Sequence, residues 1–197
     1  MSSLLALVAA TLVLVSIPGP NVALIIANSL RFGLRIGAVT ALGTTAGVAM
    51  QLAVIVLGMA AVIEFAADLL GLIKWAGVAY LAVLGIRTWR EPASDLTRMK
   101  PAPAVFWPGF MLAVANPKTL LFNAAFIPQF IASEGSSVAD VVMIGAVFLS
   151  VLLLGDVVWA SFAHSARRLL VRYGRLRNRL TATCFTAAAI GLALARR

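Results

Sequence analysis

The sequence predicts an all-α integral membrane protein, with six transmembrane helices arranged as two inverted repeats of three helices. Two observations of composition lead to this fold class. Of the 197 residues, 62% are hydrophobic and 12% are charged, against about 25% charged in an average soluble protein. Six apolar stretches also approach the roughly 20 residues that a helix needs to cross a bilayer. They are residues 4–30, 37–63, 69–85, 105–131, 141–163 and 180–195.

Two proline motifs interrupt apolar runs that are otherwise long enough to span. They are Pro18-Gly19-Pro20-Asn21 and Asn116-Pro117-Lys118. Proline lacks a backbone N–H and clashes with the preceding turn, so each motif is expected to end one half-helix and to start another. Asn116 suits the N-cap of the restarted helix and Pro117 suits its first position, and Gly19-Pro20 can restart the first helix in the same way.

A helix broken inside the bilayer points to a function. Irregular backbone at this depth is tolerated only where protein buries it or where it lines a wet cavity. Broken helices in corresponding halves of a chain indicate the binding site of a transporter. Each restarted half-helix also offers free N–H groups and a partial positive charge, which favour an anion. We therefore expect a binding site at the two breaks.

The loops between the predicted spans alternate in charge. The first, third and fifth loops hold twelve of the sixteen basic residues, whereas the second and fourth hold acidic residues. The positive-inside rule then predicts the basic loops in the cytoplasm and both termini outside. If the first run turns back at its break, the N-terminus lies inside instead. This placement accounts for the net charge of +9, so we expect no nucleic-acid partner. The basic segment 164–179 either anchors the topology or also lies on inner-leaflet lipids.

The chain is expected to form one transmembrane domain, residues 1–197, with one repeat over about 1–100 and the other over about 101–197. An odd number of spans in each half makes the two halves enter the membrane from opposite sides. The repeat is inferred from this architecture, because the two halves share little sequence.

Two charged residues lie deep in the predicted spans. Lys118 is in the first turn after a break, where its charge opposes the helix dipole, so it is expected to have a partner: a substrate carboxylate or an acidic side chain. The alternative is a lysine that extends to the interface. Asp156 is the one acid deep inside a predicted span, where a carboxylate costs about 2.5–3.5 kcal/mol. At 1.5 Å per residue the two lie roughly 10 Å apart in depth, close enough to form either a proton- or substrate-coupling site or a static ion pair.

Other polar and small residues are assigned weaker roles. Gln51, Asn28, Asn123 and Gln129 either line a cavity or bridge helices, and bridging is favoured. The two glycine pairs at a spacing of four, 33/37 and 43/47, are expected to allow close helix packing.

The residue inventory excludes several classes of protein. Cys184 is the single cysteine and His164 the single histidine, so there is no dithiol relay and no cluster for a metal. The chain has no nucleotide-binding P-loop motif. We therefore expect neither an enzyme nor a bound metal or other cofactor, and any transport must be passive or coupled to an ion gradient.

Four segments together resemble a known family. They are 17–21 with the glycine-rich stretch 33–47, then 76–85, 116–130 and 155–160. Over nearly the whole chain they are similar to the lysine exporter (LysE/RhtB) family. The resemblance implies export of amino acids and related metabolites from the bacterial cytoplasm, with proton antiport the usual proposal. Some members carry an acid in the second helix where Gln51 stands here, which argues against a basic substrate.

The prediction is thus a multi-pass secondary transporter of the bacterial inner (plasma) membrane. It exports an amino acid or a closely related metabolite by proton antiport, with Lys118 and the half-helix N-termini holding the carboxylate and Asp156 carrying the proton. The alternative is a membrane scaffold or regulatory subunit with no flux of its own. A homo-oligomer is compatible with the sequence but not specified by it. The candidate residues for substrate binding or coupling are Pro18, Gly19, Pro20, Asn21, Gln51, Asn116, Pro117, Lys118 and Asp156.

Overall fold

The computed structural model describes residues 2–57, 75, 78–79, 82–83, 85–87, 89–90, 104–131, 137–170 and 174–194. Within these residues every secondary-structure element is an α-helix. The predicted span over 69–85 falls largely outside them. The helices are α1 (Ser2–Ser16), α2 (Pro20–Phe32), α3 (Leu34–Leu57), α5 (Phe106–Val114), α6 (Pro117–Ile131), α7 (Val138–Leu170) and α8 (Gly174–Leu194).

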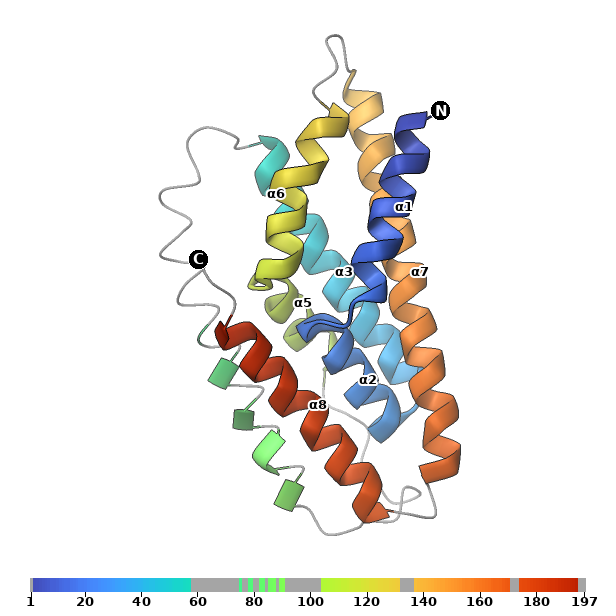
Figure 1. Ribbon diagram of the computed structural model, residues 1–197, viewed down its shortest axis with the longest axis vertical. Coiled ribbons are helices and arrows are strands. Elements are labelled where there is room, and N and C mark those ends of the chain that lie inside the picture. The colour runs from blue at the N-terminus through green and yellow to red at the C-terminus, as the bar shows by residue number, and fades with distance from the viewer. Residues whose placement is uncertain are drawn as a thin grey trace.

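Both predicted breaks are present. The run over 4–30 divides into α1 and α2, and the run over 105–131 divides into α5 and α6. Figure 1 shows α1 followed by α2 from one end of the molecule to the other, beside the long α7, with α5 and α6 following one another in the opposite direction. In this view α2 keeps the general direction of α1. Both breaks lie near the middle of the molecule's length (Figure 1).

Helix α3 lies at the centre and contacts α2, α5, α6 and α7. Its approach to α5 depends on small residues. Gly43 and Gly47 lie directly against the backbone oxygens of Phe106 and Phe110, and Gly109 of α5 lies against the backbone of Thr40. A side chain at any of these glycines would meet backbone atoms, so the predicted packing role of the 43/47 pair is confirmed.

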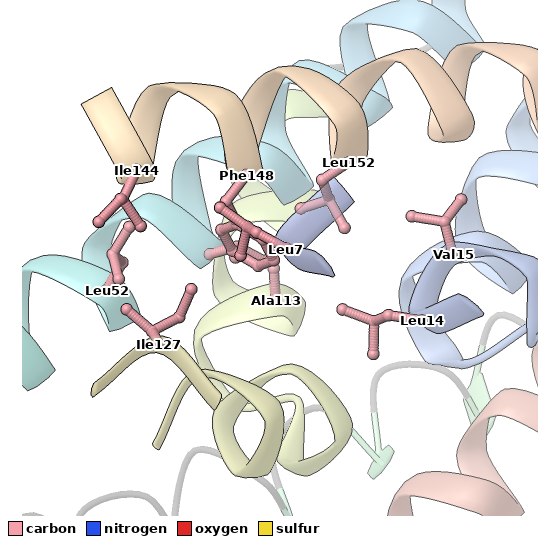
Figure 2. Packing of buried hydrophobic residues seen from close by; sticks show 10 residues of the cluster. Leu7, Leu14, Val15, Leu52, Ala113, Ile127, Ile144, Phe148 and Leu152 are labelled. Carbon is pink, nitrogen blue, oxygen red and sulfur yellow. The ribbon is translucent and has the colours of Figure 1, made fainter. Parts of the chain in front are cut away.

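A hydrophobic cluster fixes the end of α1 that precedes the first break. Leu7, Leu14 and Val15 of α1 belong to one buried cluster with Phe148 and Leu152 of α7. In Figure 2 Leu7 lies beside Phe148, whereas Leu14 and Val15 lie on the side of the cluster away from Leu52 of α3. Inside a bilayer such packing is favoured by van der Waals contact between the side chains rather than by removal of apolar surface from water. The last turn of α1 is thus held in place against α7, where Gly155 lies directly against Val15.

Two described helices are long and apolar enough to cross a membrane. They are the segments Leu34–Val56 and Val138–Arg167, and the pair α1–α2, bent by 59° at its break, counts as a third if it is one span. Large apolar side chains such as Leu12, Leu154 and Phe162 are exposed on the outside of the bundle, as lipid contact requires. The all-helical membrane fold is confirmed in this form, whereas the six-helix inverted repeat stays a prediction.

Candidate functional site

The first break leaves the N-terminus of α2 open. Gly19 is the N-cap residue in an extended conformation, Pro20 follows at the first helical position, and no side chain caps the helix. A backbone bond from the Ala23 N–H to the Gly19 oxygen, 2.9 Å long, closes the first turn. The predicted restart at Gly19-Pro20 is confirmed. The first-turn N–H groups of an uncapped helix have no intrahelical partner and carry partial positive charge.

The C-terminus of α1, on the other side of this break, is capped from distant parts of the chain. The ammonium of Lys118 donates to the Leu14 oxygen at 2.6 Å and also to the Ile17 oxygen. The indole N–H of Trp159 donates to the Val15 oxygen at 3.0 Å. These carbonyls are the orphan acceptors of a helix end, where a cation is favourable.

In this structure the partners of the Lys118 ammonium are backbone carbonyls. The sequence predicted a substrate carboxylate or an acidic side chain, because a cation in the first turn of α6 opposes that helix's dipole. The side chain instead leaves α6 and reaches the negative end of α1. The opposing effect of one dipole is thereby offset by the attraction of another.

At the second break, neutral side chains cap both the end of α5 and the start of α6. Asn116 is 1% exposed, and its side-chain oxygen accepts the N–H of Lys118 at 3.1 Å. The Thr119 hydroxyl donates to the Asn116 backbone oxygen at 3.1 Å. Asn116 is therefore the N-cap of α6 and Pro117 its first residue, as the sequence predicts.

Gln51 of α3 caps the C-terminal end of α5. Its amide nitrogen lies 2.8 Å from the Ala113 oxygen, 3.0 Å from that of Val114 and 3.3 Å from that of Asn116. Its own side-chain oxygen accepts from the Asn123 amide at 3.3 Å. Gln51 thus bridges helices, as favoured from the sequence, and satisfies the acceptors of the second break. Asn28 also bridges, donating to the Thr40 hydroxyl at 3.0 Å.

Asp156 lies on α7 and is 3% exposed. The Thr44 hydroxyl of α3 lies 3.3 Å from its Oδ2 and 2.9 Å from the Ala41 oxygen. A hydroxyl has one proton to donate. If Thr44 donates this proton to the Ala41 oxygen, its hydroxyl oxygen can still accept a hydrogen bond from Asp156, provided that the carboxyl group of Asp156 is protonated.

The sequence left open whether Asp156 and Lys118 form a coupling site or a static ion pair, and in the structure each of them bonds to another partner. The charges are near enough to interact, but the ammonium is bonded to α1 and the carboxyl group to Thr44. The carbonyls at the end of α1 lie within hydrogen-bond reach of the ammonium. Gly155 packs directly against Val15, which places Asp156 beside the same end of α1.

Asn21, in the first turn of α2, is 6% exposed, and its side-chain oxygen has no hydrogen-bond partner in the described part of the chain. Buried acceptors are rarely left unpaired.

Of the nine candidates, the structure gathers Gly19, Pro20 and Lys118 at the first break, with Asn21 in the helix that starts there and Asp156 nearby. Gln51, Asn116 and Pro117 form the second break. Pro18 is exposed within the first.

Two residues at the site were not singled out as candidates. Thr44 is one of several threonines in α3, and nothing in its spacing distinguishes it. Trp159 lies three residues after Asp156, so it shares a face of α7 with the carboxyl group. That spacing is the one signal that could have drawn attention to it.

The fold and these two interrupted helices define a class, the helical membrane proteins with discontinuous helices that move solutes. A comparison with family models is more specific: the LysE type translocator model matches residues 12–196. The chain belongs to this family, so the resemblance seen in the sequence is confirmed. It is a membrane transporter and not an enzyme.

Relatives agree with this membership. The chain is 30% identical over 175 residues to the uncharacterized membrane protein YrhP of Bacillus subtilis (strain 168), covering 82% of this chain and 81% of that protein. It is 28% identical over 170 residues to the cysteine/O-acetylserine efflux protein of Escherichia coli (strain K12), covering 85% and 86%. No solved structure matches.

Proposed function

We propose that this protein exports an amino acid, or a closely related small metabolite, from the bacterial cytoplasm across the inner membrane by proton antiport. The similarity to a protein named for cysteine and O-acetylserine efflux supports a small amino acid as the substrate class. The arrangement at the first break supports a site that takes a carboxylate at one end.

The carboxylate site consists of the uncapped N-terminus of α2 and the ammonium of Lys118. A Cβ placed on Gly19 would lie 3.2 Å from Cδ and 3.8 Å from Nζ of Lys118, so the ammonium lies directly beside the open helix end. This juxtaposition is the observation that carries the proposal. Helix N-termini and lysine are both established binders of anions. A substrate carboxylate here competes with the α1 carbonyls for the ammonium.

Asp156 is the proton carrier in this proposal. Its hydrogen bond with Thr44 can be made with the carboxyl group neutral or ionised, because the hydroxyl can accept or donate. Its charge also acts on Lys118. Ionisation of Asp156 therefore changes how strongly the ammonium is held, and this links proton release to carboxylate binding. The unpaired oxygen of Asn21 is available to accept from the substrate's amino group.

Proteoliposomes test this proposal. They are loaded with a pool of the common amino acids together with O-acetylserine, a pH gradient is imposed, and the species that leave are identified by mass spectrometry. We expect selective, gradient-driven efflux that is lost in Asp156→Asn. Asp140→Asn is the matched control, because Asp140 lies on the same helix but is exposed and bonded to Ser137. Full activity of Asp156→Asn would exclude the coupling role.

The scaffold alternative keeps one supporting observation, since Lys118 caps α1 in a way that also suits a purely structural residue. A scaffold predicts no flux of any pool member from folded, inserted protein. It also predicts that Asp156→Asn changes stability alone. The same proteoliposome experiment, with the melting temperature of each variant recorded, separates the two functions.

A further inference from the structure

The α2–α3 turn and the C-terminal end of α7 lie at the same end of the molecule (Figure 1). Gly33 joins α2 to α3 with φ of 95°, a left-handed conformation that favours glycine. We use the name basic corner for Gly33, Leu34, Arg35, His164 and Arg167. None of these residues has a role in the proposed substrate site.

Two side chains of α7 converge on Gly33. A Cβ placed on this glycine would lie 3.2 Å from Nη1 of Arg167 and 3.8 Å from Nδ1 of His164. The two residues are three positions apart and therefore share one face of α7. The absence of a side chain at position 33 lets both nitrogens approach the turn from which α3 starts.

The nitrogens of the basic corner have unused hydrogen-bonding capacity. Nε of Arg167 and Nδ1 of His164 are buried and have no hydrogen-bond partner in the described part of the chain. The described carboxylates are those of Asp140 and Asp156, which bond to Ser137 and Thr44 respectively. Neither one neutralises Arg167.

The helix dipole makes this arrangement unfavourable without an anion. Arg167 lies beside the N-terminus of α3, and Arg35 is in the first turn of the same helix, so both cations are at a positive helix end. Arg31 differs, because it is in the last turn of α2, where a cation is favourable, and it stacks over Phe32 with 5.1 Å between Cζ and the ring centroid. An arginine that serves only to orient the chain in the membrane can lie at the C-terminal end of a helix, as Arg31 does, and does not need to lie at a helix N-terminus.

We propose that the basic corner binds a phosphate group, held by the Arg167 guanidinium, the His164 imidazole and the first N–H groups of α3. Arginine matches phosphate oxygens with two parallel bonds, and a helix N-terminus adds backbone donors. The candidate span in α7 ends at Arg167 itself, which puts the corner at the level of lipid headgroups. The phosphate belongs to an anionic lipid or to a soluble phosphate compound.

Binding measurements on the purified full chain test this site. Phosphatidylglycerol is titrated into protein in neutral detergent and followed by native mass spectrometry and melting temperature, with phosphatidylcholine as the reference lipid. A separate arm adds inorganic phosphate against chloride at equal ionic strength. We expect one retained phosphatidylglycerol per chain, and about tenfold weaker binding in Arg167→Gln, the loss of one charge-assisted contact.

The matched control is Arg179→Gln. It removes the same charge from an exposed arginine of α8 that stacks over Trp89, with 5.9 Å between Cζ and the ring centroid. General attraction of the basic face to anionic lipid would fall equally in both variants. His164→Leu supplies a second test if Arg167→Gln does not fold, and its binding is also expected to weaken.

Each result decides the proposal. Tight binding of phosphatidylglycerol alone supports the site and assigns a lipid headgroup, whereas a comparable shift with inorganic phosphate supports the site and assigns a soluble phosphate. The proposal is overturned if wild type binds neither. Equal losses in Arg167→Gln and Arg179→Gln would also overturn it, as would unchanged binding in the folded His164 or Arg167 variant.

Discussion

The two helix breaks are built from the same kind of motif but are completed differently. At the first, the ammonium of Lys118 and the indole of Trp159 cap α1, and the N-terminus of α2 stays open. At the second, the amide of Gln51 caps α5 and Asn116 caps α6. The helix ends of the second break therefore have neutral, fixed side-chain partners, although the side-chain oxygen of Asn123, which bonds to Gln51 through its amide nitrogen, has no partner in the described part of the chain. The first break keeps a charged donor beside a helix N-terminus that no side chain caps, which is why we propose the carboxylate site there.

The largest effect is expected when the charge is removed from the first break. Lys118→Met should abolish efflux, because the carboxylate loses its ammonium partner, and should also destabilise the end of α1 by about 1.5–3 kcal/mol. Lys118→Arg keeps a charged donor and should fold normally with reduced transport. Efflux rate per folded, inserted protein is the measurement. Near-normal transport in the methionine variant would show that the charge of Lys118 is not needed for substrate binding, so that the first break would have no role that the second lacks.

Removal of the cap from the second break should act on stability first. Gln51→Leu removes the side-chain donor of the Val114 carbonyl, whereas the Ala113 and Asn116 carbonyls keep the N–H groups of Asn116 and Leu120. An acceptor left unsatisfied in this way costs about 1–3 kcal/mol. We expect a lower melting temperature in detergent, with efflux per folded molecule close to wild type at low temperature. A loss of efflux without a loss of stability would show that the second break also takes part in binding.

The space beside Lys118 can be tested with one methyl group. Gly19→Ala puts a Cβ 3.2 Å from Cδ of Lys118 in a backbone conformation that alanine adopts without strain, so a several-fold fall in transport is expected with little change in stability. Gly145→Ala is the control, since its Cβ would lie 3.3 Å from Leu52, away from both breaks. Similar transport rates in the two variants would remove the special status of the Gly19 position.

The smallest effect is expected at Trp159. Trp159→Phe keeps most of the apolar ring and loses the bond to the Val15 oxygen, which costs about 1 kcal/mol. Thermal unfolding measures this directly. Because Lys118 caps the neighbouring carbonyls of α1, transport should persist. A complete loss of efflux would mean that the indole contributes more to the first break than a cap.

The breaks themselves are predictable from sequence because their determinants are local. Proline chemistry and the preferences of Asn116 and Gly19 for helix starts operate over a few residues, and both restarts occur where the sequence puts them. Lys118 and Asp156 also stand out as charges inside apolar runs. Each of these signals is contained in one segment of the chain.

The partners are not predictable in the same way. Lys118 bonds to carbonyls 104 and 101 positions away, and Gln51 to carbonyls 62 to 65 positions away. Backbone acceptors have no sequence signature, so these bonds follow only from how α1 packs on α6 and α3 on α5. For the same reason the sequence left a Lys118–Asp156 ion pair open as one of two alternatives. It could not show that the end of α1 would take the ammonium instead.

In the proposed mechanism, Lys118 exchanges the α1 carbonyls for a substrate carboxylate. The chain contains three lysines, Lys74, Lys100 and Lys118, so protein labelled with ¹⁵N at the lysine Nζ gives three signals in nanodiscs, and Lys118→Arg assigns one of them. Titration with the amino acid found by the efflux experiment should move the Lys118 signal and leave the other two in place. An unchanged Lys118 signal at a saturating substrate concentration would contradict the account.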